Sequence, residues 1–419
     1  MSAASGQSNA RLWNVGYVSL LVAQFFGAAN DNILKQCLIF MVTTGIWHEQ
    51  LGEGGQVVPA LCLTIPFIVL SGYAGQVADR YSKQQVTRWI KLVEIPIAAL
   101  AFVGFQQENL WLTLGALLLL SSQSAFFGPA KYGAIPELMA ESHLSKANGF
   151  INMFTNLAII AGSLLAGPIS DLYLPEDPNQ TPLRWVPGAA MVTVAILGYI
   201  ACLAIPRLPA ADPNLTYNYN PFATYWSSLK EMAASPLLTV ALAWAGFYMI
   251  GMMALLIVPE YERILGISYA ETSYLVGILG IAIAVGSVSA GMLSGEHIRP
   301  WFIPFGATGM TVCFGLLGLL APDYKSVAAL IFFAGVSAGF YIVPLQALMQ
   351  ALSPDNERGR FLGTANALSF CFTTAGSLLY WIVNNRFGMP PNRVHLVCAT
   401  LALSGTVIGV LRLRRLTGR

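Results

Sequence analysis

Charged and amide side chains interrupt a long apolar run near the N-terminus. Asp31 and Lys35 are four residues apart, and Gln24 shares their helical face seven and eleven residues earlier. Ionisable side chains inside a membrane cost roughly 2.5–3.5 kcal/mol each on insertion scales, and they commonly mark a substrate or ion pathway. We therefore expect a charged strip that faces a central cavity. A self-neutralised Asp31–Lys35 pair that serves only packing is the alternative.

A second buried cation is expected in the segment Phe127-Gly-Pro-Ala-Lys-Tyr-Gly133. Proline frees a backbone carbonyl, and the glycines thin the helix so that another group can approach. Lys131 could extend its side chain to the cytoplasmic surface. Otherwise it would meet Asp31 or a phosphate group inside the protein.

Further polar side chains recur at helical spacing in other apolar runs. Such stripes can hold helices together by hydrogen bonds, but their presence on five separate runs favours one shared cavity. The residues predicted to bind a substrate there are Gln24, Asn30, Asp31, Lys35, Lys131, Tyr132, Asn152, Asn156, Gln346 and Asn366.

The composition shows which elements must position these side chains. The chain has 419 residues, of which 56% are hydrophobic and 10% charged, whereas soluble domains carry about 25% charged residues. A spanning helix needs about 20 mostly apolar residues, so we predict an all-α membrane protein with twelve transmembrane helices. They are expected near 14–45, 57–78, 87–106, 110–134, 148–170, 186–206, 236–260, 270–293, 300–320, 324–350, 361–384 and 394–412.

Lysine and arginine predict the orientation of these spans. With the N-terminus in the cytoplasm, fifteen basic residues, Lys91 among them, fall on the cytoplasmic side and five outside, while Lys35 and Lys131 lie at membrane depth. This excess follows the positive-inside rule, so both termini are expected in the cytoplasm. The net charge of +2 is too small to suggest a nucleic-acid partner.

An internal repeat predicts two pseudo-symmetric six-helix bundles. Asn152 is followed nine residues later by Ala-Gly-Ser-Leu-Leu, and Asn366 is followed in the same way, at an offset of 214 residues. The proline- and asparagine-rich stretch between the halves is typical of a linker. We predict an N-terminal bundle over residues 1–206, a cytoplasmic linker over 207–235 and a C-terminal bundle over 236–419. Parallel six-helix repeats are the plan of the major facilitator transporters, which bind substrate between the halves.

The loop after the second predicted span resembles the major facilitator signature. It reads Gly75-Gln-Val-Ala-Asp79-Arg80-Tyr-Ser-Lys83. Glycine allows helices to approach closely, and Asp79 can accept hydrogen bonds from the N-terminus of a neighbouring helix. We expect a conformational latch on the cytoplasmic face, formed by Gly75, Asp79, Arg80 and Lys83. A plain positive-inside loop is the alternative.

Three segments together resemble the bacterial lysophospholipid transporter family of the major facilitator superfamily. They are Ala28-Ala-Asn-Asp-Asn32, the loop at Gly75–Asp79, and Phe127–Gly133 with Pro136-Glu-Leu138. The resemblance implies that lysophosphatidylethanolamine and related lysolipids are flipped from the outer to the cytoplasmic leaflet of the inner membrane. A cytoplasmic acyltransferase partner would then re-acylate them. It also implies that Asp31 and Lys131 are the family's charged site residues.

A lysolipid also needs an apolar wall for its single acyl chain. The candidates are Phe25, Phe26, Phe127, Trp244, Tyr248 and Met252. Each of these could instead be ordinary core or face lipid.

The main alternative function is a proton-coupled exporter of amphipathic drugs or other small molecules, in which Asp31 would carry the proton. An enzyme is not expected, because none of the four histidines has an aspartate at acyltransferase spacing. The six cysteines are scattered through apolar runs, so no metal site or cofactor is predicted. We expect a monomer that works among membrane lipids.

Overall fold

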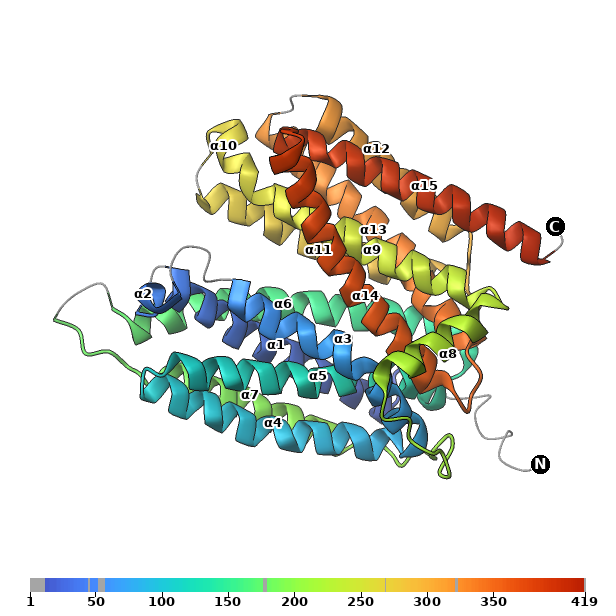
Figure 1. Ribbon diagram of the computed structural model, residues 1–419, viewed down its shortest axis with the longest axis horizontal. Helices are drawn as coiled ribbons and strands as arrows, with labels where there is room; N and C mark the ends of the chain where they lie inside the picture. Colours follow the sequence, from blue (N-terminus) through green and yellow to red (C-terminus); the bar gives the residue numbers. More distant parts are fainter. Residues whose placement is uncertain are drawn as a thin grey trace.

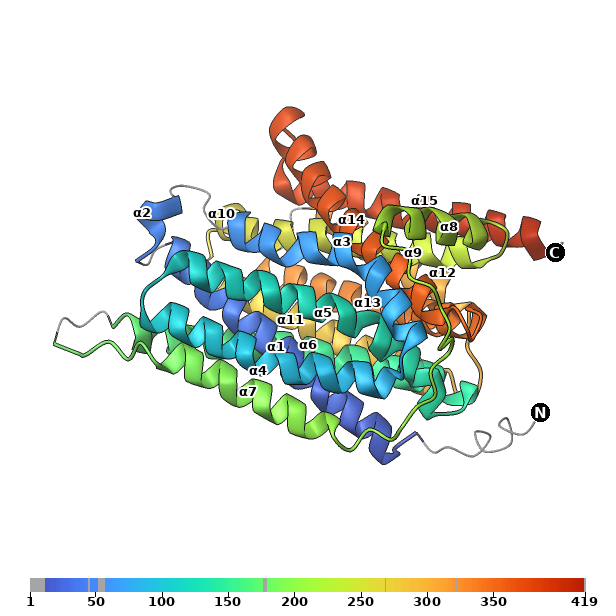
Figure 2. The same cartoon turned by 60° about the horizontal axis from the view of Figure 1, so that its bottom comes forward.

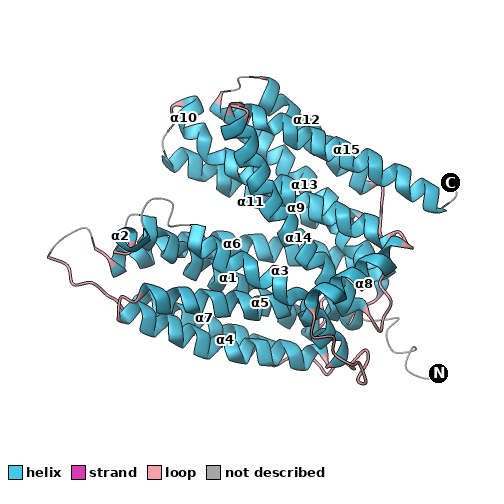
Figure 3. Ribbon diagram, viewed as in Figure 1, coloured by secondary structure: helices cyan, strands magenta, loops and turns pink. Residues whose placement is uncertain are grey.

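The computed structural model describes residues 12–43, 46–51, 57–175, 179–267, 269–320 and 323–417. Within these ranges the chain forms helices and loops and no strand (Figure 3). The predicted all-α fold is confirmed. Apolar runs of membrane length can satisfy their backbone groups only within a helix or a closed barrel, and helical runs of this length are the simpler solution.

Each predicted span coincides with one helix of 17 residues or more. Eight of these helices are long and apolar enough to cross a membrane by length and composition, namely α3, α5, α6, α9 and α11 to α14. The long helices are α1 (Val15–Thr43), α3 (Val57–Arg80), α4 (Lys83–Gln106), α5 (Leu110–Leu138), α6 (Leu144–Tyr173), α7 (Val186–Cys202), α9 (Leu237–Ile257), α11 (Tyr269–Leu293), α12 (Phe302–Leu319), α13 (Tyr324–Leu352), α14 (Arg358–Trp381) and α15 (Pro391–Thr417). The shorter ones are α2 (His48–Leu51), η1 (Glu141–His143), α8 (Pro221–Ala233), η2 (Val258–Glu260), α10 (Tyr261–Leu265) and the π-helical turn η3 (Ile382–Arg386).

The helices form two groups that follow the two halves of the sequence (Figure 1). Helices α1 and α3 to α7 pack on one another, and α9 and α11 to α15 pack on one another. The C-terminal group has one apolar core, while the N-terminal group has two. We propose that these groups are the two predicted domains, 1–206 and 236–419.

Two seams join the halves, one between α3 and α14 and one between α6 and α11. Both depend on glycine, since a Cβ at Gly75 would lie 2.5 Å from the Gly359 oxygen, and one at Gly149 would lie 2.5 Å from the Ser287 oxygen. Small residues permit such close helix contacts. The seams lie towards the end of the molecule that carries α8, and the helix groups spread apart towards the end with α2 and α10 (Figure 1).

The expected linker contains a helix that the sequence reasoning missed. Asn220 caps α8 by accepting from the Phe222 and Ala223 amides. The Tyr225 hydroxyl then accepts from the Gly72 amide at 2.8 Å and donates to the Ile68 oxygen at 2.7 Å. The linker helix α8 is therefore held against α3, and it also packs on α9 and α14 (Figure 2).

Candidate functional site

A cavity of about 380 Å³ lies between the two halves, within the usual ~300–1,000 Å³ of small-molecule sites. Helices α5 and α6 supply a wall whose polar part is formed by Tyr132, Asn152, Thr155 and Asn156, and α6 adds Ile159 and Ile160 next to it. The opposite wall comes chiefly from α9, α11, α12 and α13 and is apolar. Its side chains include Phe247, Tyr248, Ile250, Met252, Leu255, Leu279, Ile283, Met310, Phe314 and Ile342.

Amide side chains close the polar wall against the C-terminal half. The Asn152 Nδ2 donates to Gln346 Oε1 at 2.8 Å, and Gln346 Nε2 donates to the Tyr132 hydroxyl at 3.2 Å. One turn away, Asn148 Nδ2 donates to Gln350 Oε1 at 2.7 Å. Helices α6 and α13 are thus tied together beside the cavity, and three predicted site residues meet there.

The other predicted amides have different places. Gln24 Nε2 donates to the Thr155 hydroxyl at 3.0 Å, so it supports the polar wall from α1. Asn156 lines the cavity and donates within its own helix. Asn366 Nδ2 donates to the Ser71 hydroxyl at 2.9 Å, which places Asn366 in the α3–α14 seam rather than among the cavity residues.

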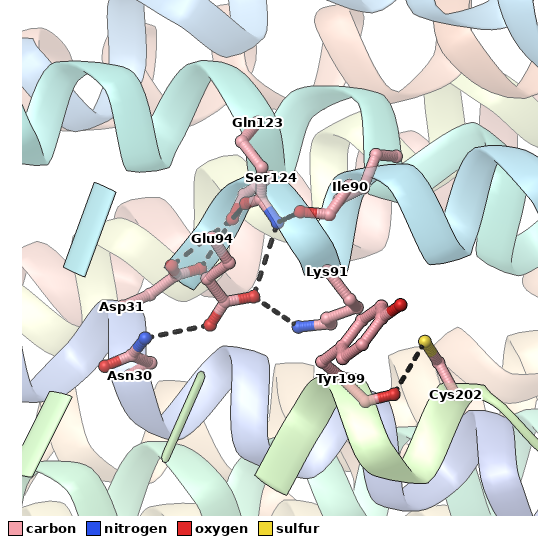
Figure 4. A network of polar contacts seen from close by, with 9 residues as sticks. All are labelled: Asn30, Asp31, Ile90, Lys91, Glu94, Gln123, Ser124, Tyr199 and Cys202. Carbon is pink, nitrogen blue, oxygen red and sulfur yellow. Dashed lines mark hydrogen bonds and ion pairs between the residues drawn. The ribbon is translucent and has the colours of Figure 1, made fainter. Parts of the chain in front are cut away.

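Asp31 is half-buried on α1 and is held by Ser124 of α5, whose hydroxyl lies 3.0 Å and 3.3 Å from the two carboxylate oxygens (Figure 4). Lys35 Nζ donates instead to Asn32 Oδ1 at 2.9 Å. Among the described side chains Asp31 and Lys35 form no ion pair. The pairing that their spacing suggested is therefore absent, because each has a nearer partner.

Two buried charges behind Asp31 were missed by the sequence reasoning. Lys91 and Glu94 of α4 form an ion pair of 2.7 Å, with both side chains 1% exposed. Glu94 Oε1 also accepts from Asn30 Nδ2 at 2.8 Å (Figure 4). Lys91, which the sequence suggested as a cytoplasmic basic residue, has its side chain inside the helix bundle. An acid and a base one turn apart within a predicted span was the signal that could have found them.

Lys131 is 7% exposed and does not extend to the surface. Its ammonium lies 4.4 Å from the centre of the Tyr132 ring and 5.8 Å from that of Phe127. No ion pair with a carboxylate forms at Lys131 within the described part of the chain. A buried cation without a carboxylate at ion-pair distance attracts an anion strongly. Asp31 and Lys131 are not among the residues that line the cavity, but Tyr132, next to Lys131 on α5, is.

Of the predicted acyl-chain wall, Tyr248 and Met252 line the cavity. Trp244 is buried and packs edge-on against Tyr132, with ring centres 5.5 Å apart. Neither Trp244 nor the other three predicted wall residues are among the cavity residues. Phe127 contacts the two lysine ammonium groups, Phe25 packs on Phe154, and Phe26 faces Gly198 of α7.

The signature segment lies in the α3–α14 seam. Asp79 is fully buried, and its carboxylate accepts from the amides of Gly359 at 2.6 Å and Arg360 at 2.8 Å. This is the N-terminus of α14, where the helix dipole favours a negative charge. Lys83 is buried against Glu137. Arg80 lies 4.5 Å over the ring of Tyr217 in the linker.

One segment has the spacing of a nucleophile elbow, Gly335-Val-Ser-Ala-Gly339. It lies in the middle of α13, where the Ser337 hydroxyl donates to the Phe333 oxygen at 2.7 Å. A nucleophile elbow requires a sharp turn from a strand into a helix. This serine therefore has the position and the partner of an ordinary helical serine.

Sequence comparison places these features in a known context. The chain is 29% identical to the lysophospholipid transporter LplT of Escherichia fergusonii over 376 residues, covering 87% of this chain and 86% of the relative. It is 28% identical to LplT of an Enterobacter species over 378 residues, with the same coverage. The resemblance to proteins of that name, carried by the segments around Asp31, Asp79 and Lys131, is confirmed.

Solved structures show the same fold. The transporter FucP in its outward conformation aligns with a TM-score of 0.76 at 12% identity, covering 95% of this chain and 99% of FucP. A bacterial homologue of ferroportin in an outward-facing state aligns with a TM-score of 0.70 at 15% identity, covering 97% and 100%. The sequence profile of the Major Facilitator Superfamily matches residues 20–379 and 242–417. The chain is a multi-pass membrane transporter that belongs to the Major Facilitator Superfamily.

Proposed function

We propose that this protein carries lysophospholipids from the outer to the cytoplasmic leaflet of a bacterial inner membrane. The head group would bind at the polar wall formed by the N-terminal half. The single acyl chain would lie along the apolar wall formed by the C-terminal half. The name shared by the relatives LplT supports this substrate class.

The observation that carries the proposal is the environment of Lys131. Its buried ammonium lies over the ring of Tyr132, a cavity residue, and forms no ion pair among the described side chains. A lysolipid phosphate would supply the missing anion in a site of low dielectric, where charge-assisted contacts are strong. Asp31, half-buried on α1, could contact the amine of an ethanolamine head group.

Alternating access would follow from the two seams. In this structure the halves are joined near α8 through Asp79 and through the Asn148–Gln350 pair. Breaking those contacts while new ones form at the opposite end would move the cavity opening from one leaflet to the other. We propose that the α8 end is cytoplasmic, with both termini there, as the positive-inside rule predicts.

The remaining parts of the proposal concern partners. Delivered lysolipids would be re-acylated by a cytoplasmic acyltransferase. The transporter itself would act as a monomer and catalyse no covalent step.

The test is transport in proteoliposomes. Labelled lysophosphatidylethanolamine is added outside, and the fraction protected from extraction by albumin is followed with time. We expect protein-dependent uptake, and Asp171→Asn, which changes an exposed carboxylate on α6, should leave it unchanged. Protection no greater than in protein-free vesicles would overturn the proposal.

A second arm of this experiment distinguishes lysolipid transport from the alternative function, proton-coupled export. Asp31 is a carboxylate at membrane depth, as a proton-coupled exporter would need. The same assay is run with and without an imposed proton gradient. Uptake independent of the gradient supports the lysolipid proposal, whereas uptake that an uncoupler abolishes favours proton coupling.

A further inference from the structure

The Lys91–Glu94 pair lies on α4, outside the residues that line the cavity. Both side chains are 1% exposed and their charged atoms are 2.7 Å apart. Replacing a buried ion pair by apolar groups of similar volume is often neutral or stabilising. The pair therefore needs a reason other than stability, and its remaining contacts supply one.

Glu94 connects to Asp31 by two routes (Figure 4). One carboxylate oxygen accepts from Asn30 Nδ2 at 2.8 Å, and Asn30 directly precedes Asp31 on α1. The other accepts from Gln123 Nε2 at 3.3 Å, and Gln123 directly precedes Ser124, which holds the Asp31 carboxylate. The ring of contacts joins α1, α4 and α5 and fixes the position of Asp31 from both sides.

Lys91 lies near Lys131, beside the same aromatic ring. Its ammonium lies 5.0 Å from the centre of the Phe127 ring, and the Lys131 ammonium lies 5.8 Å from the same centre. Helix α1 makes room for Lys91 at Gly27, where a Cβ would be 2.2 Å from Nζ. A Cβ at Gly27 would therefore require the Lys91 ammonium to shift from its present position.

We propose that Lys91 and Glu94 are positioning residues that hold Asp31 and Lys131 at the separation required by a zwitterionic phospholipid head group. They do not touch the substrate themselves. The inference rests on the proposed function, and it extends the head-group site to α4, a helix that contributes no side chain to the cavity lining.

The test measures binding of two ligands with the same acyl chain to purified protein in detergent. Lysophosphatidylethanolamine has the charged head group, and monoacylglycerol lacks it. Glu94→Gln keeps the shape of the side chain and removes its charge. We expect it to weaken lysolipid binding about tenfold and to leave monoacylglycerol binding unchanged. The matched control is Glu296→Gln, at an exposed glutamate in the turn after α11.

A double variant, Lys91→Met with Glu94→Gln, separates positioning from simple charge balance. It leaves no unpaired charge, so it should fold and elute as a single species. We expect its lysolipid binding to remain about tenfold weaker. Full recovery of binding in the double variant would show that the pair only balances charge, and would overturn the inference.

The outcomes distinguish the inference from the proposed function. Wild-type protein that binds no lysolipid refutes the proposed function, and the inference with it. Wild-type protein that binds lysolipid while Glu94→Gln binds it equally well refutes the inference alone. Equal losses for both ligands in a folded Glu94→Gln variant would also refute it, because a positioning role acts on the head group only.

Discussion

The two walls of the cavity differ in chemistry although the chain shows an internal repeat. The N-terminal wall carries most of the polar side chains, and charged residues lie close to it, half-buried on α1 and buried on α4 and α5, whereas the C-terminal wall is almost wholly apolar. The repeated asparagines show the same divergence, since Asn152 lines the cavity and Asn366 bonds Ser71 in a seam. The two halves therefore have similar helical frames but present different side chains to the cavity.

Removing a charge from the polar half should have the largest effect. Lys131→Met and Asp31→Asn each delete a group proposed to contact the head group in a buried setting. We expect uptake of lysophosphatidylethanolamine to fall about 30-fold or more in each variant. Initial rates in proteoliposomes measure this. Lys325→Met, at an exposed lysine near the start of α13, is the control, and near-normal uptake by Lys131→Met would contradict the assignment.

The next largest effect on uptake is expected from the α3–α14 seam, because we propose that this seam controls which leaflet the cavity opens to. Asp79→Asn weakens two short hydrogen bonds to the N-terminus of α14. We expect the halves to separate at the α8 end and uptake to fall about tenfold. Distances between spin labels on α3 and α14 would lengthen. Glu357→Gln removes a partly exposed ion pair to Arg360, which keeps a second carboxylate partner in Glu231, and should change little. Unchanged distances in Asp79→Asn would contradict a latch.

Enlarging a side chain on the apolar wall of the cavity should weaken binding of the acyl chain and leave binding of the head group unchanged. Met252→Trp enlarges a cavity side chain. We expect the KM for long-chain lysolipids to rise about fivefold, and substrates with shorter chains to be affected less. A chain-length series measures this, with Met292→Trp, at an exposed methionine in α11, as control. An increase independent of chain length would count against an acyl-chain wall.

The smallest effect is expected where the two halves share a neutral hydrogen bond. Tyr132→Phe removes the hydroxyl that accepts from Gln346 at 3.2 Å and keeps the ring over Lys131. We expect about a threefold fall in uptake. Tyr274→Phe, at an exposed tyrosine of α11, serves as the comparison. A loss as large as that of Lys131→Met would mean that the hydroxyl, and not the cation, is the main contact.

The sequence predicted the helical framework better than the contacts of the candidate site residues. Long apolar runs identified the twelve helices because membrane span length is a strong constraint. Asp79 was also placed correctly against a helix N-terminus. By contrast, α8 is short and begins in a polar stretch, so hydropathy gave no indication of it.

The site itself depends on tertiary neighbours that spacing cannot reveal. Asp31 and Lys35 have the spacing of an ion pair, yet Ser124 and Asn32 are their partners. Lys91 resembled one more cytoplasmic basic residue until its burial was known. The apolar wall was mostly unpredicted, because α9 is apolar all round and its sequence does not show which face meets the cavity.

One measurement tests most directly whether the polar wall binds the head group and the apolar wall binds the acyl chain. Wild type, Asp31→Asn and Met252→Trp are assayed in proteoliposomes with four substrates that combine a phosphoethanolamine or a neutral head group with a long or a short acyl chain. The account predicts that Asp31→Asn changes only the dependence on head group, and that Met252→Trp changes only the dependence on chain length. Losses that are the same for all four substrates in both variants would contradict it.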